Sequence, residues 1–267
     1  LGRCVDVAAW RGRRLCAPAG PGRGGAAMNV SRFLSALLAT AAVVAGCADD
    51  APTDSEVARG RAVFTDPSIS TSSSNVFSCA TCHATDEGAS TRTLSGATLA
   101  GVVRRTSFWG GREDDLLTAI NRCRSFFMDT PTPWLGTEPE ARELYTFLAS
   151  LPDAVVNPVQ FTVPPVARLP DGRHDAVRGE EVYTRACAIC HGALHTGRGG
   201  IAPLAPKLPD ETLREHVASY AESERPIVFV EKTRHGPFFQ YGGVMPPFSV
   251  EVLPDDDLSS LLAYLGF

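Results

Sequence analysis

The sequence predicts an all-α fold made of two small helical domains in tandem, joined by a proline-rich linker. Neither half of the chain shows a convincing set of alternating apolar and polar residues, so no sheet is expected. Each half instead closes on an amphipathic helix whose apolar residues recur at i, i+3, i+4 and i+7. These residues are Leu144, Phe147, Leu148 and Leu151 in the first half, and Leu258, Leu261, Leu262 and Leu265 in the second.

The two halves also begin alike. The first opens with "VARGRAVF" and the second with "AVRGEEVY", so Gly60 and Gly179 each precede an aromatic residue, Phe64 or Tyr183, by four positions. Four positions correspond to about one helical turn, which places glycine and ring on the same face. Each opening segment is followed by a Cys-x-x-Cys-His motif. An internal duplication of one helical unit accounts for the repeat.

The domain boundaries follow from the composition of the segment between the two halves. We place the first domain at residues 55–152 and the second at residues 173–267. Residues 153–172 between them are rich in proline and lack helical periodicity, which is typical of a semi-rigid linker.

The N-terminal region has the pattern of an export signal. We interpret residues 1–27 as an upstream or untranslated segment and Met28 as the start, followed by a charged region and the apolar run "FLSALLATAAVVAG". The run is shorter than the ~20 residues that a membrane span requires. Residues 28–46 are therefore expected to be a lipoprotein signal peptide, because "VVAGC" resembles a bacterial lipobox. Cys47 would carry the lipid and residues 47–54 would form a tether; an ordinary signal peptide is the alternative.

Charge limits the kinds of partner. The chain has a formal net charge of -5, and residues 1–46 contain six arginines and one aspartate, which leaves about -10 for the rest. An acidic protein lacks the basic surface that nucleic-acid binding requires. It is better suited to redox partner proteins with basic surfaces.

The repeated motif has three chemical interpretations. Its residues are Cys79, Cys82 and His83 in the first half and Cys187, Cys190 and His191 in the second. A structural zinc site needs four ligands, and a redox dithiol is typical of a βαβ context that is missing here. Covalent haem c needs two cysteines on one helical turn for the vinyl groups and an adjacent histidine for iron. Export and duplication favour this third interpretation, with two covalently bound haem c groups.

Both halves resemble class I cytochrome c domains. The resemblance rests on the glycine–aromatic helix, the Cys-x-x-Cys-His motif and the closing amphipathic helix, and it covers nearly all of residues 55–267. It implies that the first and last helices of each domain cross and that the haem lies among apolar loops. It also implies a second axial ligand from a loop before the last helix.

In the second half, Met245 is the predicted axial ligand. It lies in "GGVMPPF", where two prolines stiffen the loop, and the chain has only three methionines. Methionine as a simple filler of a core gap is the alternative. His235, in "EKTRHGPFFQYGG", could line the same haem pocket.

In the first half, Cys123 and Met128 are both candidate ligands. The segment "NRCRSFFMDTPTPW" resembles sulfur-oxidising cytochromes of the thiosulfate dehydrogenase type, which implies cysteine as the ligand at this position. Cys123 is also the one thiol not accounted for by the motifs, the lipid site or residues 1–27. Met128 as the ligand, with Cys123 as a buried bystander, is the alternative.

The function expected from these features is electron transfer by a lipid-anchored di-haem c-type cytochrome, exported to the periplasm or the cell surface. A haem enzyme that oxidises a sulfur compound such as thiosulfate is the first alternative. A di-haem peroxidase is the second, because "GRAVFTDPSISTSSSNVFSCATCH" is similar to the first haem segment of those enzymes. With six-coordinate irons, a peroxidase would have to lose a ligand before peroxide could bind.

Overall fold

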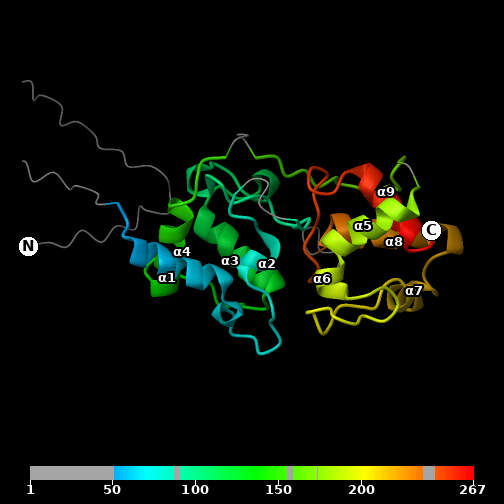
Figure 1. Ribbon diagram of the computed structural model, residues 1–267, viewed down its shortest axis with the longest axis horizontal. Coiled ribbons are helices and arrows are strands. Elements are labelled where there is room, and N and C mark those ends of the chain that lie inside the picture. Colours follow the sequence, from blue (N-terminus) through cyan, green and yellow to red (C-terminus); the bar gives the residue numbers. More distant parts are fainter. Residues whose placement is uncertain (1–50, 87–90, 155–158, 173, 237–243) are drawn as a thin grey trace, which may run out of the picture.

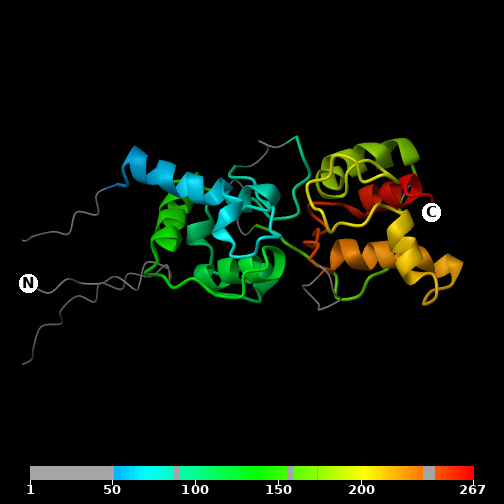
Figure 2. The same cartoon turned by 90° about the horizontal axis from the view of Figure 1, so that it is seen from below.

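In the described part of the chain, helices joined by loops fold into two lobes that lie side by side (Figures 1 and 2). In this computed structural model the described residues are 51–86, 91–154, 159–172, 174–236 and 244–267. Within these ranges no strand forms, and Phe108 and Glu113 make an isolated β-bridge. The all-α prediction is confirmed for this part of the chain.

The first lobe consists of helices α1 to α4 and three short 3-10 turns. Its helices are α1 (Asp54–Thr65), α2 (Cys79–Cys82), α3 (Leu116–Phe127) and α4 (Pro139–Ala149), and its turns are η2 (Pro67–Ile69), η3 (Val102–Arg104) and η4 (Trp109–Gly111). Helix α1 begins at a capping box, in which the Thr53 side chain accepts from the Glu56 N–H and the Glu56 carboxylate accepts from the Thr53 N–H.

The second lobe repeats this arrangement with helices α5 to α9. Its elements are α5 (Ala176–Ala186), α6 (Ala188–His191), α7 (Asp210–His216), η5 (Glu222–Glu224), α8 (Arg225–Arg234) and α9 (Asp255–Tyr264). Three aspartates form the first turn of α9, where the positive end of the helix dipole favours them.

In each lobe the first and last helices cross at a glycine. A methyl group on Gly60 of α1 would overlap the carbonyl oxygen of Glu143 in α4, and one on Gly179 of α5 would overlap the carbonyl of Ser260 in α9. Backbones can approach this closely only where one residue lacks a Cβ. The aromatic residue four positions later packs at each crossing, as ring pairs Phe64–Phe147 (5.2 Å) and Tyr183–Tyr264 (5.5 Å).

The predicted apolar faces are the buried faces. All eight periodic residues of the two closing helices are at most 8% exposed, and they belong to two separate hydrophobic cores, one in each lobe. Leu151 and Leu265 lie just beyond the ends of α4 and α9, where they extend the same faces.

The described second part of the proline-rich segment is attached to the second lobe. The N–H of Thr162 donates to the carboxylate of Glu251 (2.8 Å), and the Thr162 carbonyl accepts from the N–H of Val250 (3.0 Å). This stretch therefore runs along the second lobe, close to the loop that follows Met245.

One further observation concerns membranes. In the ranges given above, no helix has both the length and the hydropathy needed to cross a bilayer. The predictions for residues 1–27, for the signal peptide at 28–46 and for lipid on Cys47 fall outside the described residues.

Candidate haem sites

Both Cys-x-x-Cys-His motifs lie on single-turn helices, α2 and α6. The N–H of His83 donates to the carbonyl of Cys79 and the N–H of His191 donates to that of Cys187, each over 3.0 Å. One turn separates the two cysteines of each motif, so both thiols project from the same side of the helix, with the histidine next to them. This is the arrangement required to attach one planar group by two bonds and to ligate its metal.

The two histidines have the same hydrogen-bonded orientation. Nδ1 of His83 lies 2.8 Å from the carbonyl oxygen of Ala97, and Nδ1 of His191 lies 2.9 Å from that of Pro206. A carbonyl can only accept, so Nδ1 carries the proton and Nε2 keeps its lone pair. Burial lowers the pKa of both imidazoles, which keeps them neutral. Histidines that ligate metals are oriented in this way.

Gly96 fixes the position of the first histidine. A Cβ at this glycine would overlap the imidazole ring of His83, so the ring lies directly against the backbone. The Gly96 N–H donates to the carbonyl of Cys82 (2.9 Å), which ties the loop to the end of α2. Nothing in the sequence pattern singled out this residue.

The second lobe contains a cavity of about 400 Å³ that brings its predicted ligands together. Cys187, Cys190, His191 and Met245 all line it. The rest of its wall in this lobe is mainly apolar and includes Leu208, Phe229, Phe248, Leu258, Leu261 and Leu262. Cofactor pockets are typically ~300–1,000 Å³ and apolar with a few polar groups, so these residues fit haem c.

The loop that carries Met245 is anchored by a buried arginine. Arg234 is 2% exposed, and its Nη1 donates to the carbonyls of Phe248 (3.1 Å) and Ser249 (3.0 Å). Its Nη2 pairs with Asp255 at the start of α9 (2.7 Å). The arginine thus joins α8, the loop and α9, and it restrains the chain on the C-terminal side of Met245.

His235 has a different position from the one expected. It is fully buried, but it is not among the residues that line the cavity. Nδ1 bonds to the carboxylate of Glu231 (2.5 Å) and Nε2 to the carbonyl of Pro164 (2.6 Å). The prediction that it lines the haem pocket is wrong, because both nitrogens serve to hold the proline-rich segment against α8.

In the first lobe, Cys123 lies on α3 and is partly buried, as are Cys79 and Cys82. Met128 lies just past the end of α3 and is buried, and its carbonyl accepts from the Ser70 hydroxyl (2.5 Å). Both candidate ligands of the first lobe are therefore at least partly shielded from solvent.

Burial keeps the cysteine thiols protonated. It raises the pKa of Cys79 and of Cys187 to about 12 and that of Cys190 to about 11, and it also raises the pKa values of Cys82 and Cys123. A catalytic dithiol needs the opposite shift of the cysteine pKa, toward the thiolate.

Across the described residues, no group of three or more His, Cys, Asp or Glu side chains is arranged to hold a metal ion. Neither the dithiol nor the zinc interpretation gains support.

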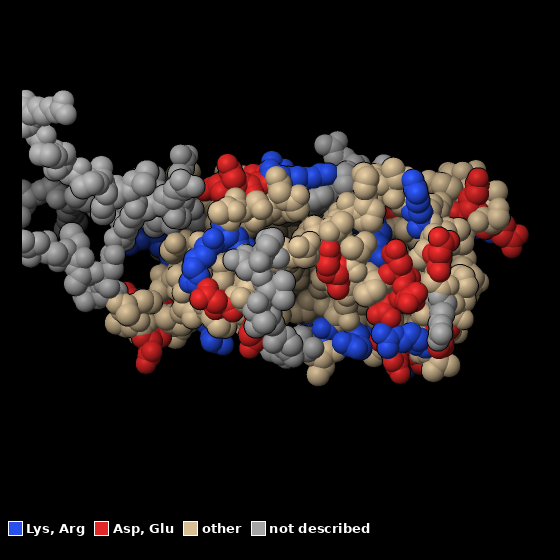
Figure 3. Space-filling view, turned by 90° about the horizontal axis from the view of Figure 1, so that it is seen from above, with Lys and Arg blue, Asp and Glu red and all other residues tan. Residues whose placement is uncertain are grey.

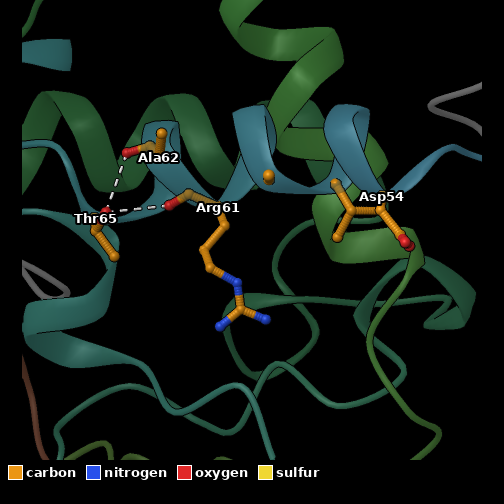
Figure 4. Close-up of a pocket in the computed structure, with 6 residues that line it drawn as sticks. Asp54, Arg61, Ala62 and Thr65 are labelled. Carbon is orange, nitrogen blue, oxygen red and sulfur yellow. Dashed lines mark hydrogen bonds between the residues drawn. The ribbon is translucent and has the colours of Figure 1, made fainter.

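A second cavity lies along one side of α1 and contains none of the candidate ligands (Figure 4). It is lined by Asp54, Val57, Ala58, Arg61, Ala62 and Thr65. The Thr65 hydroxyl bonds back to the carbonyls of Arg61 and Ala62, at 3.1 and 3.2 Å. These two bonds are local to the C-terminal end of α1, and we assign no site to this cavity.

Comparison with known proteins identifies the second lobe. Residues 174–265 match the family described as cytochrome C oxidase, cbb3-type, subunit III. This part of the chain is therefore a cytochrome c domain, which implies at least one covalently bound haem c and redox protein partners. No curated protein matches the chain.

Proposed function

We propose that the chain is a di-haem c-type cytochrome that transfers electrons outside the cytoplasm, with one haem in each lobe. The observation that carries this proposal is the duplicated site geometry. His83 caps the end of α2 and His191 ends α6, and each donates from Nδ1 to a carbonyl, over 2.8 and 2.9 Å. Because the second lobe is a cytochrome c domain, the same geometry in the first lobe supports the same role.

The ligand assignment follows from these positions. Cys79, Cys82 and His83 would hold the first haem, and the chemistry that each bound haem supplies is one-electron exchange at its iron. Cys187, Cys190 and His191 would hold the second haem, with Met245 as its sixth ligand. Histidine–methionine ligation favours the reduced iron and raises its potential.

For the first haem we propose Cys123 as the sixth ligand. This choice is supported by the spare thiol on α3 and by the resemblance of its segment to sulfur-oxidising cytochromes. A thiolate is a strong donor, so this haem would have the lower potential. Two haems with well-separated potentials would give electrons a preferred direction through the chain.

Cys123→Ala is expected to abolish the low-spin signal of the first haem, whereas Met128→Ala is expected to leave it intact. The reason is that only the first change removes a donor to iron. Absorption and electron paramagnetic resonance spectra of the full chain measure both variants, and the signal of the second haem serves as an internal control. Loss of the signal in Met128→Ala alone would instead assign methionine.

Absorption spectra recorded after the addition of thiosulfate test the alternative in which the protein oxidises a sulfur compound. The spare thiol of Cys123 on α3 is the observation that favours this alternative, given the resemblance of its segment to thiosulfate dehydrogenases. For a carrier, thiosulfate leaves the haems oxidised while dithionite reduces them. Rapid reduction by thiosulfate, lost in Cys123→Ala, would assign the enzymatic function.

Location and partners belong to the same proposal. We propose export and lipid attachment at Cys47, which agrees with the usual extracytoplasmic location of cbb3-type cytochrome c domains. The matched family is described as an oxidase subunit, so a redox protein is the proposed partner. On the face shown in Figure 3, acidic and basic side chains are interleaved over both lobes. The net charge of the chain is -5, so a partner that presents basic groups is proposed.

A further inference from the structure

The cavity of the second lobe is completed by the first lobe. Besides the residues of the cytochrome c domain, its lining includes Thr81, Cys82 and residues 92–95. Thr81 and Cys82 belong to the attachment helix of the first lobe, and residues 92–95 lie just before Gly96. Part of the wall around the proposed second haem is therefore formed by the other half of the chain.

Two hydrogen bonds hold this wall in place. The N–H of Thr93 donates to the carbonyl of Arg185 (3.0 Å), and Nε of Arg185 donates to the carbonyl of Thr91 (3.1 Å). Arg185 lies at the end of α5, two residues before Cys187. One bond joins two backbones and the other comes from the Arg185 side chain, and together they hold segment 91–95 beside the second attachment motif.

Arg92 lies between the two attachment motifs. Its Nη2 donates to the carbonyl of Thr81 (2.9 Å), which ties the side chain to α2. Arg92, Cys82 of the first lobe and Cys190 of the second lobe all line the same cavity. The side chain is partly buried at this junction, where solvent screens charges less than at an open surface.

We propose that the second haem site is a composite of both lobes, closed by residues 91–95, and that Arg92 is a positive charge shared by the two haem sites. This inference rests on the proposed di-haem function. A positive charge near a redox centre favours the state with one more electron. Arg92 therefore acts as a positioning and tuning residue that raises both reduction potentials, although it belongs to the first lobe.

The test is a redox titration of full-length Arg92→Gln, with each haem followed by its own spectrum. The midpoint potentials of both haems are expected to shift downward, because one positive charge is removed from both sites. Arg92→Lys, which keeps the charge, is expected to stay close to the wild type. The matched control is Arg142→Gln, the same change at an exposed position of α4 in the same lobe, which is expected to move neither potential.

A second variant tests the closure itself. Arg185→Ala removes the side-chain bond to Thr91 and is expected to speed reduction of the second haem by a small soluble reductant such as ascorbate, leaving the first haem unaffected. Two results together would overturn the composite site. In Arg92→Gln the midpoint potential of the first haem alone would fall, and in Arg185→Ala ascorbate would reduce the second haem at the wild-type rate. A protein that carries one haem per chain would instead overturn the proposed function, so the two failures are distinguishable.

Discussion

Met245→His is expected to lower the reduction potential of the second haem sharply and to leave that of the first unchanged. Met245 lines the cavity together with Cys187, Cys190 and His191, so its thioether would supply the sixth ligand to a haem iron bound there. Imidazole is a stronger donor than a thioether and favours the oxidised iron. Axial ligands adjust haem potentials over a range of ~0.8 V, so the shift should be among the largest that one substitution can produce.

Redox titration monitored by absorption measures this effect. The control is Met128→His, a change of the same chemical kind in the first lobe, which is expected to leave the second haem at its wild-type potential. If Met245→His leaves the second haem unaltered while it remains low-spin, the sixth ligand is another residue and Met245 only fills the cavity wall.

The largest expected loss of stability comes from Gly179→Ala. The added methyl group would overlap the carbonyl oxygen of Ser260, and a backbone atom cannot move aside unless α5 separates from α9. Overpacking of this kind typically costs about 1–3 kcal/mol, occasionally more. The cost should exceed the gain of up to ~1 kcal/mol that alanine offers over glycine in a helix. Denaturant unfolding of the full chain, followed by far-ultraviolet circular dichroism, measures the change.

Thr184→Ala supplies the control, because it leaves the same alanine side chain at an exposed position of α5, where nothing is overlapped. It is expected to change the free energy of unfolding by no more than ~0.5 kcal/mol. Equal or greater stability of Gly179→Ala would show that the helices do not cross as closely at this point as the structure has them.

The helical faces were predictable because they depend on local spacing, whereas the crossing of the first and last helices was implied by the cytochrome c resemblance. Leucines at i, i+3, i+4 and i+7 share one face of any helix, whatever surrounds it. These patterns identified the buried faces of α4 and α9, and Gly60 and Gly179 are the residues at which α1 and α5 are crossed.

The residues that complete the sites were not predictable from local patterns. Gly96, Arg92 and Arg185 act through contacts with segments distant in sequence, and their neighbours carry no periodic signal. In the sequence, Arg234 is only one charged residue near the end of a predicted helix. In the structure it is buried and donates to two carbonyls of the Met245 loop. A burial pattern set by tertiary packing can be learned only from the folded chain.

His235 shows how residue type can mislead. A histidine ten positions before the predicted ligand is a reasonable candidate for the pocket wall. The structure instead gives both ring nitrogens acceptors, Glu231 and Pro164, of which the second comes from the segment between the lobes. For Cys123 and Met128 the sequence left two candidates, and the spectra of the Cys123→Ala and Met128→Ala variants decide between them.

The most direct test of the whole account is mass spectrometry of proteolytic peptides from the full-length protein, produced in a host that attaches haem c. The account predicts one haem on the peptide that contains Cys79 and Cys82, and one on the peptide that contains Cys187 and Cys190. A haem on the second peptide alone, with unmodified thiols on the first, would contradict the claim that both lobes are haem-binding domains.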